Sequence, residues 1–163
     1  MNIDQNKGKE MKKLLIIFIV LSVSTCGLYS QNKTIKGRVI SDQFDTSLEV
    51  LIMINDTVEV GRTDLNGFFQ IDIPVSVKKI LFRSIGLDPT IIELEDKCDE
   101  VEVVMMLGST DDFITFKKAD RLRMKRFMKL PELHKEAFEK GIFKTDKACY
   151  KQEFTPFYTK KQK

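Results

Sequence analysis

Hydrophobic and polar residues alternate with a period of two through much of the segment 34–108. Within it, for example, Phe69, Ile71 and Ile73 are separated by single polar residues. Such alternation places an apolar row on one face of an extended strand and is typical of half-buried antiparallel strands. The pattern predicts seven strands, near 35–39, 50–54, 58–63, 68–73, 80–82, 92–94 and 101–107. Because parallel pairing would require crossover helices, for which there is no room, we expect an antiparallel sandwich.

Turn-forming residues separate these expected strands. Asn66-Gly67 lies between the third and fourth strands, and Asn-Gly is a strong signal for a two-residue hairpin because both positions accept a positive φ. Asn55-Asp56 lies in the same way between the second and third strands. We therefore expect the third and fourth strands to form a tight hairpin that turns at Asn66-Gly67.

The pattern becomes helical after residue 108. Ser109–Asp112 supplies capping and acidic residues that suit a helix N-terminus. From about residue 111 to 129 an apolar stripe lies opposite a basic face, which predicts an amphipathic helix. The stripe consists of Phe113, Phe116, Ala119, Phe127 and Leu130, and the basic face of Lys117, Lys118, Arg121, Lys125 and Lys129. A second helix is expected to begin at Pro131 and to end at Gly141.

The first 30 residues have the organisation of a secretory signal peptide. Two lysines precede the apolar run Leu14–Leu21, which is shorter than a membrane span, and small and polar residues follow it. Met11, directly before the lysines, offers a second start of translation. We expect cleavage near Gln31, with a lipid on Cys26 as the alternative. The sequence thus predicts export to the periplasm or outer membrane, as a soluble, secreted or lipid-anchored protein.

Charge is segregated along the chain. Residues 34–108 carry 7 basic and 14 acidic residues, a net charge of −7, whereas residues 109–163 carry 15 and 8, a net charge of +7. Such asymmetry indicates either that the tail folds back on the body or that it faces an acidic partner. We expect the first arrangement, with the aromatic stripe packed on the sandwich and Lys117, Arg121 and Lys125 in solvent. Peripheral contact with a membrane or an anionic lipid is the alternative for the basic face.

Composition narrows the chemistry that the chain can perform. With 163 residues, of which 42% are hydrophobic and 31% charged, it fits one globular domain with appendages and excludes a disordered chain. Its single histidine, His134, has no H-x-x-E spacing and no second histidine, which excludes a carboxypeptidase-type zinc site. We expect a packed, hydrogen-bonded His134, and neither catalytic residues nor a metal or other cofactor.

Three cysteines bear on the compartment. If Cys26 leaves with the signal peptide, Cys98 and Cys149 remain in an oxidising environment. They form either a disulfide, which would tie the tail to the turn before the last strand, or two separate buried thiols. Both alternatives stay open at the level of the sequence.

Four motifs occur in an order known from one protein family. They are Ile35-Lys36-Gly37-Arg38-Val39, Gly61-Arg62-Thr63-Asp64-Leu65-Asn66-Gly67-Phe68-Phe69-Gln70-Ile71, Leu81-Phe82-Arg83-Ser84-Ile85-Gly86-Leu87 and Val101-Glu102-Val103-Val104-Met105. In these motifs the chain resembles the carboxypeptidase-regulatory-like domain, a transthyretin-type β-sandwich common in cell-envelope proteins of Bacteroidetes. The resemblance spans about 75 residues, nearly half of the chain.

The resemblance implies a transthyretin-like arrangement for the segment 34–108. Together with the helical pattern after residue 108, we expect a mainly β protein, namely a seven-stranded antiparallel transthyretin-like β-sandwich over 34–108 followed by a two-helix basic C-terminal extension over 109–163. The resemblance also implies structural roles at one loop, where Asn66 and Gly67 supply the turn and Asp64 caps it by accepting backbone amides.

Domains of this family are often appended to zinc carboxypeptidases or to outer-membrane receptors, where they are accessory. The expected function is that of a non-enzymatic exported envelope protein acting as a binding or accessory module. Its expected partner is another envelope protein and not a nucleic acid. The alternative is a structural partner of an outer-membrane receptor or transporter.

Overall fold

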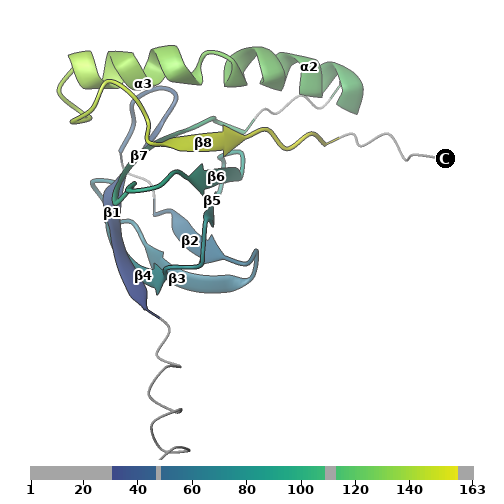
Figure 1. Cartoon of the computed structure of the whole chain (residues 1–163). Coiled ribbons are helices and arrows are strands. Elements are labelled where there is room, and N and C mark those ends of the chain that lie inside the picture. Colours follow the sequence, from purple (N-terminus) through teal and green to yellow (C-terminus); the bar gives the residue numbers. More distant parts are fainter. Residues whose placement is uncertain (1–30, 47–48, 109–112, 158–163) are drawn as a thin grey trace, which may run out of the picture. The chain divides into compact units, whose positions relative to one another are not determined.

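The computed structural model describes residues 31–46, 49–108 and 113–157, which form eight strands and two helices (Figure 1). The strands are β1 (Asn32–Ser41), β2 (Leu51–Ile54), β3 (Val58–Arg62), β4 (Phe68–Pro74), β5 (Lys79–Arg83), β6 (Thr90–Leu94), β7 (Glu100–Met105) and β8 (Tyr150–Glu153). The helices are α2 (Phe116–Phe127) and α3 (Leu130–Glu139). The expected signal peptide, with Cys26, and the expected helix start at 109–112 lie outside the described residues.

The strands form two sheets, which confirms the expectation of a mainly β fold. One sheet has three strands in the order β4-β1-β7, and the other has five in the order β3-β2-β5-β6-β8. The seven strands expected in the body are present, but the expectation of a seven-stranded sandwich is wrong because the tail adds β8 to the edge of the second sheet, antiparallel to β6. The four residues of β8 are mostly polar, so hydrophobic alternation does not mark them in the sequence.

The pairing of β1 with β7 is parallel, and Gly37 lies opposite Val101. The expected antiparallel sandwich is therefore wrong at this pair. The chain between β1 and β7 makes the crossover through β2, β3, β5 and β6 of the other sheet and through β4, which pairs with the far side of β1, so that no crossover helix is needed. The approach is close: a Cβ atom at Gly37 would lie 1.7 Å from the backbone oxygen of Val101, so only glycine fits there.

The two expected turns have different roles in the structure. Asn55 and Asp56 have φ angles of 51° and 61°, and there the chain makes a tight hairpin between β2 and β3. Gly67 has a φ of 79°, and Oδ1 of Asp64 accepts two backbone amides of its loop at 2.9 and 2.8 Å. However, β3 and β4 lie in different sheets, so the hairpin expected at Asn66-Gly67 is wrong. Turn residues specify the local backbone, whereas strand pairing depends on where each strand buries its apolar face.

The main hydrophobic core fills the space between the two sheets. Phe69 of β4 and Phe82 of β5 meet there with ring centroids 5.6 Å apart. The buried core residues are Ile35, Val39, Val50, Ile52, Ile54, Phe69, Ile71, Ile73, Ile80, Phe82, Leu87, Ile92, Leu94, Cys98, Val101, Val103 and Met105. Most of them occupy the positions that the alternation assigned to one face, so the hydrophobic effect explains why these strands form a sandwich.

The two helices lie end to end across one end of the strands, next to β7 and β8 (Figure 1), and α3 packs against the outer side of β1 and β7. A second apolar cluster joins α3 to these strands, and its buried members are Ile40, Val104, Met106, Leu130, Ala137 and Phe143. α3 has proline in its first turn, and Gly141, with a φ of 71°, follows its end. The described part of the tail thus folds back on the body.

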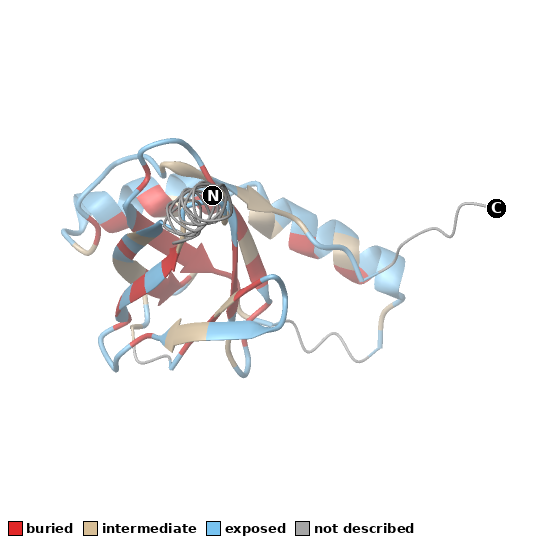
Figure 2. Cartoon of the chain, turned by 60° about the horizontal axis from the view of Figure 1, so that its bottom comes forward, coloured by how far each residue is buried: buried red, intermediate tan, exposed pale blue. Residues whose placement is uncertain are grey.

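The aromatic stripe of α2 is only partly buried, which corrects the expectation that it packs on the sandwich. Phe127 is half-buried beside Phe154, with ring centroids 5.4 Å apart. In contrast, the side chain of Phe116 is 70% exposed and that of Phe113 is fully exposed. The N-terminal part of α2 projects past the strands (Figure 2), so these two rings lie beyond the area that the sheets cover. The sequence of a helix does not show where the sheet beneath it ends.

Candidate functional site

A disulfide and a strand attach the tail to the five-stranded sheet. Cys98 and Cys149 are bonded, with their Cα atoms 5.5 Å apart. Directly after Cys149, β8 pairs with β6, so that Tyr150 lies opposite Leu94 and Gln152 opposite Ile92. The disulfide thus fixes the beginning of β8 at the edge of the sheet.

Arg123 of α2 attaches the helix layer to the body through a buried ion pair. Its guanidinium lies 2.8 Å from the carboxylate of Asp88 and 3.0 Å from that of Asp120, and all three side chains are largely buried. It also donates to the carbonyl of Thr155 at 3.1 Å and stacks on the ring of Phe157, 3.8 Å from its centroid. Charged groups are buried at acceptable cost only when they are paired in this way.

Sequence reasoning missed Arg123. Arginine is expected on a solvent-exposed face, yet Arg123 lies midway between Ala119 and Phe127 at spacings of four, on the stripe that α2 turns inward. Its position on the apolar stripe is the signal that identifies it as a buried residue.

Further polar contacts join the tail to acidic groups of the body. Arg126 lies 2.6 Å from the carboxylate of Asp42. The buried carboxylate of Glu102 accepts the backbone amides of Lys144 and Thr145 at 2.6 and 3.1 Å. Opposite charges of body and tail thus meet in specific contacts at the inner side of the tail.

A groove of about 550 Å³ opens between the tail and the edges of the two sheets. β7 and β8 are the edge strands that contribute to its walls, and α2, α3 and the loop before β8 complete it. Its lining is mostly apolar and consists of Val104, Met124, Phe127, Met128, Leu130, Pro131, His134, Asp146, Lys147, Ala148, Tyr150 and Gln152. Residues of four elements therefore come together at a concave surface that no single segment encodes.

His134 is the most unusual residue of this groove. Its side chain packs against the ring of Phe143, with ring centroids 4.9 Å apart, and the residue is 4% exposed. Its Nε2 atom is buried without a hydrogen-bond partner. The ring is packed and hydrogen-bonds to the backbone at Thr145, as expected of a packed, hydrogen-bonded histidine, but Nε2 lacks a partner. Burial lowers the pKa of His134 below its ordinary value of 6.5, and the nearby carboxylate of Glu102 opposes this only in part, so the ring is neutral at pH 7.

Two other polar side chains that line the groove, those of Tyr150 and Gln152, have partners. The hydroxyl of Tyr150 donates to the carbonyl of Glu102 at 2.7 Å, and burial raises the pKa of this phenol. The amide of Gln152 donates to the carbonyl of Val104 at 3.4 Å. Among the described residues, Nε2 of His134 is the single buried side-chain nitrogen or oxygen atom that has no partner. A buried polar atom in this condition requires an explanation, and a bound molecule is one.

The residues singled out in the sequence do not assemble into one site. Asp64, Asn66 and Gly67 stay together in the loop between β3 and β4, outside the residues that line the groove. The disulfide joins Cys98, in the turn between β6 and β7, to Cys149 directly before β8, and Cys26 lies outside the described residues. The part of the chain that the structure describes contains no group of three or more metal-ligating side chains placed to hold a metal ion.

Comparison with known proteins leaves the geometry as the basis for assigning a function. No family model matches the chain, and no curated protein matches its sequence. Within residues 31–46, 49–108 and 113–157, no helix is long and apolar enough to cross a membrane.

Proposed function

We propose that the chain is a non-enzymatic, exported binding module of the cell envelope and that the groove is its binding site. The observation that carries this proposal is the combination of an apolar lining with one buried, unpartnered atom, Nε2 of His134. An unsatisfied buried polar group costs about 1–3 kcal/mol. Nε2 has almost no accessible surface, so a ligand would recover this free energy by bonding to Nε2 once the imidazole ring turns toward the groove. Small-molecule sites commonly combine a predominantly apolar wall with a few placed polar groups.

The groove suits a ligand with an aliphatic or aromatic body and one hydroxyl group. Its volume of about 550 Å³ falls within the range of sites for small molecules. Met124 and Met128 line it, and their flexible side chains adapt to different apolar shapes. A hydroxyl group both donates and accepts hydrogen bonds, so it pairs with Nε2 in either tautomer of a neutral imidazole.

Two features support placement of this module in the envelope. The first is the resemblance of residues 34–108 to the carboxypeptidase-regulatory-like domain, whose transthyretin-like arrangement we propose for the two sheets. The second is the Cys98–Cys149 disulfide, because such bonds persist in oxidising compartments. We also propose that the apolar run Leu14–Leu21 belongs to a signal peptide.

Native mass spectrometry of the protein purified from its own envelope tests the groove. We expect the protein to carry an added small-molecule mass, which is lost when Ala148→Trp fills the lining. The matched control is Lys151→Trp, because Lys151 lies on the same strand as Tyr150 and Gln152 but points to the opposite side. Equal occupancy in the two variants would contradict the assignment of the groove.

The same purification separates the two functions expected from the sequence. An outer-membrane receptor or transporter that copurifies equally with wild-type protein and Ala148→Trp would favour the structural partner over the ligand-binding module. The mass of the purified chain tests export separately. A mature protein that retains residues 12–25 would show that the proposed signal peptide is not removed.

A further inference from the structure

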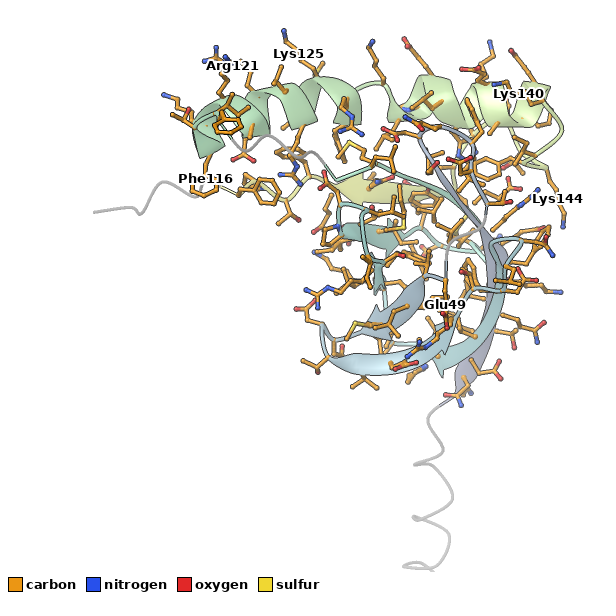
Figure 3. The ribbon with its side chains drawn as sticks, turned by 180° about the vertical axis from the view of Figure 1, so that it is seen from behind. Glu49, Phe116, Arg121, Lys125, Lys140 and Lys144 are labelled. Carbon is orange, nitrogen blue, oxygen red and sulfur yellow. A yellow bond between two sulfur atoms is a disulfide. The ribbon has the colours of Figure 1, made fainter. Side chains whose placement is uncertain are left out.

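The outer face of α2 and the turn that follows it carry a cluster of cations, which we call the basic face. It consists of Lys117, Lys118, Arg121, Lys125 and Lys129, and all five residues are exposed. Figure 3 shows Arg121 and Lys125 pointing away from the body. Within the described part of the chain, none of these five side chains forms an ion pair with a carboxylate. The face thus presents positive charge that carboxylates of the described residues do not neutralise.

The neighbouring helix shows that this is not a general property of the tail. On α3, Lys135 lies 3.7 Å from Glu139 and Lys140 lies 2.8 Å from Glu136. The inward cations of α2 are paired as well, Arg123 with Asp88 and Arg126 with Asp42. The acidic groups of the body are therefore matched to the inner side of α2, and the basic face remains available to an external anion.

Apolar side chains lie among the cations of the basic face. Leu122 and Met124 are partly exposed, and Met128 is 71% exposed. Met124 and Met128 also line the groove. A surface that mixes lysine and arginine with apolar side chains suits the boundary between lipid headgroups and acyl chains, where the charges meet phosphate groups and the apolar side chains insert.

We infer that the protein docks on an anionic lipid membrane through the basic face of α2. The phosphate groups of nucleic acids and those of anionic lipids both attract a basic face. We choose the lipid because the proposed export separates the protein from nucleic acids. In this orientation, Met124 and Met128 place one side of the groove at the lipid surface, so that a ligand moves between bilayer and groove over a short path.

Vesicle binding tests this inference. The protein as purified from its own envelope is mixed with vesicles of phosphatidylcholine containing phosphatidylglycerol, or of phosphatidylcholine alone, and bound protein is measured by co-sedimentation. We expect binding to the anionic vesicles that weakens as salt is raised. Since each cation near an anionic surface contributes about fivefold in affinity, Lys117→Gln with Arg121→Gln and Lys125→Gln should weaken binding about 100-fold.

The matched control replaces the same number of charges elsewhere. Lys135, Lys140 and Lys151 are exposed and each is ion-paired, so their change to Gln alters the net charge equally without touching the basic face. This control should retain vesicle binding. Equal losses in both triple variants would show that only net charge matters and would overturn the inference.

Two further measurements keep the proposals apart. Tighter binding of the wild type to duplex DNA than to anionic vesicles, lost in the Lys117, Arg121 and Lys125 triple variant, would assign the face to nucleic acid. The Ala148→Trp variant should still bind vesicles if the basic face is the membrane contact. If this variant loses the groove ligand and retains vesicle binding, the result tests the proposal for the groove and leaves the membrane contact of the basic face unaffected.

Discussion

At the scale of single residues, the contact between tail and body involves two side chains that are charged or polar and nevertheless buried. Arg123 is charged yet buried, and its partner Asp88 is 4% exposed. His134 is polar, buried and unpartnered at Nε2. The spacing of apolar residues predicts that both residues lie on the buried side of their helices. It does not predict the contact partner of either side chain, because that partner comes from a distant segment.

Changing Arg123→Met should destabilise the protein strongly. The variant leaves the carboxylate of Asp88 buried without its partner, which costs about 3–5 kcal/mol. Urea unfolding measures the change, and Lys125→Met on the exposed face is the control, with an effect within about 0.5 kcal/mol. The double variant with Asp88→Leu should recover much of the loss. If the single variant is as stable as the wild type, the ion pair does not hold the helix.

Changing Gly67→Ala should cost more stability than changing Gly86→Ala. Both glycines have a positive φ, 79° and 81°, which costs an alanine about 1–2 kcal/mol. At Gly67 the added Cβ would also lie 2.2 Å from the backbone oxygen of Val39, whereas at Gly86 no atom lies within 4 Å. Unfolding midpoints of the two variants compare the effects directly. Equal losses would mean that the close approach relaxes without cost.

Burial of His134 predicts that stability falls as the pH falls below 6.5. The unfolded chain has the ordinary histidine pKa of 6.5 and the folded chain a lower one, so the unfolded state binds more protons in that range. The contribution is fully present above pH 6.5 and is lost below it. Unfolding midpoints between pH 7.5 and 5 measure it, with His134→Gln as the reference that removes the titrating group. A constant difference between the two proteins across this range would contradict the burial argument.

At the scale of elements, the sequence locates most strands but not their partners. Period-two alternation marks strands that have one buried face, such as β4 with Phe69, Ile71 and Ile73. Pairing depends on contacts between distant segments, which is why the parallel β1–β7 pair and the separation of β3 from β4 were not predicted. The mostly polar strand β8 is specified by the disulfide and by β6 rather than by its own pattern.

Removing the disulfide should loosen β8 before the rest of the sheet. Cys98 and Cys149 are 51 residues apart, and closing a loop of that size contributes about 4 kcal/mol through loop-closure entropy. Cys98→Ser with Cys149→Ser should therefore lower the free energy of unfolding by up to this amount. Hydrogen exchange should show the amides of β8 losing protection more than those of β2. Unchanged protection of β8 would show that strand pairing alone holds it.

At the scale of the whole molecule, the opposite charges of body and tail correspond to a physical junction. Arg126 with Asp42 is one of its contacts, and the apolar cluster under α3 is another. Segregated charge indicated that the two parts meet. The groove was not predictable because its walls come from β7, α2, α3 and β8, which are distant in sequence.

Deleting residues 109–163 should destabilise the remaining sandwich. The deletion exposes Ile40, Val104 and Met106 on the outer face of the three-stranded sheet and leaves β6 as an open edge. We expect a lower unfolding midpoint and stronger fluorescence of a dye that binds apolar surface. A truncated protein as stable as the full chain would identify the tail as an independent arm.

The position of β8 at the edge of the larger sheet also sets an order in time. The chain leaves a ribosome or an export channel from its N-terminus. β6 therefore emerges more than fifty residues before β8, which pairs with the edge of β6 that β5 leaves open. Until then its backbone groups are open to other extended chains, and the disulfide awaits its second cysteine. β1 likewise waits for β7. The fold is therefore completed from its tail, and the edge of β6 stays open to pairing with other chains until β8 has emerged.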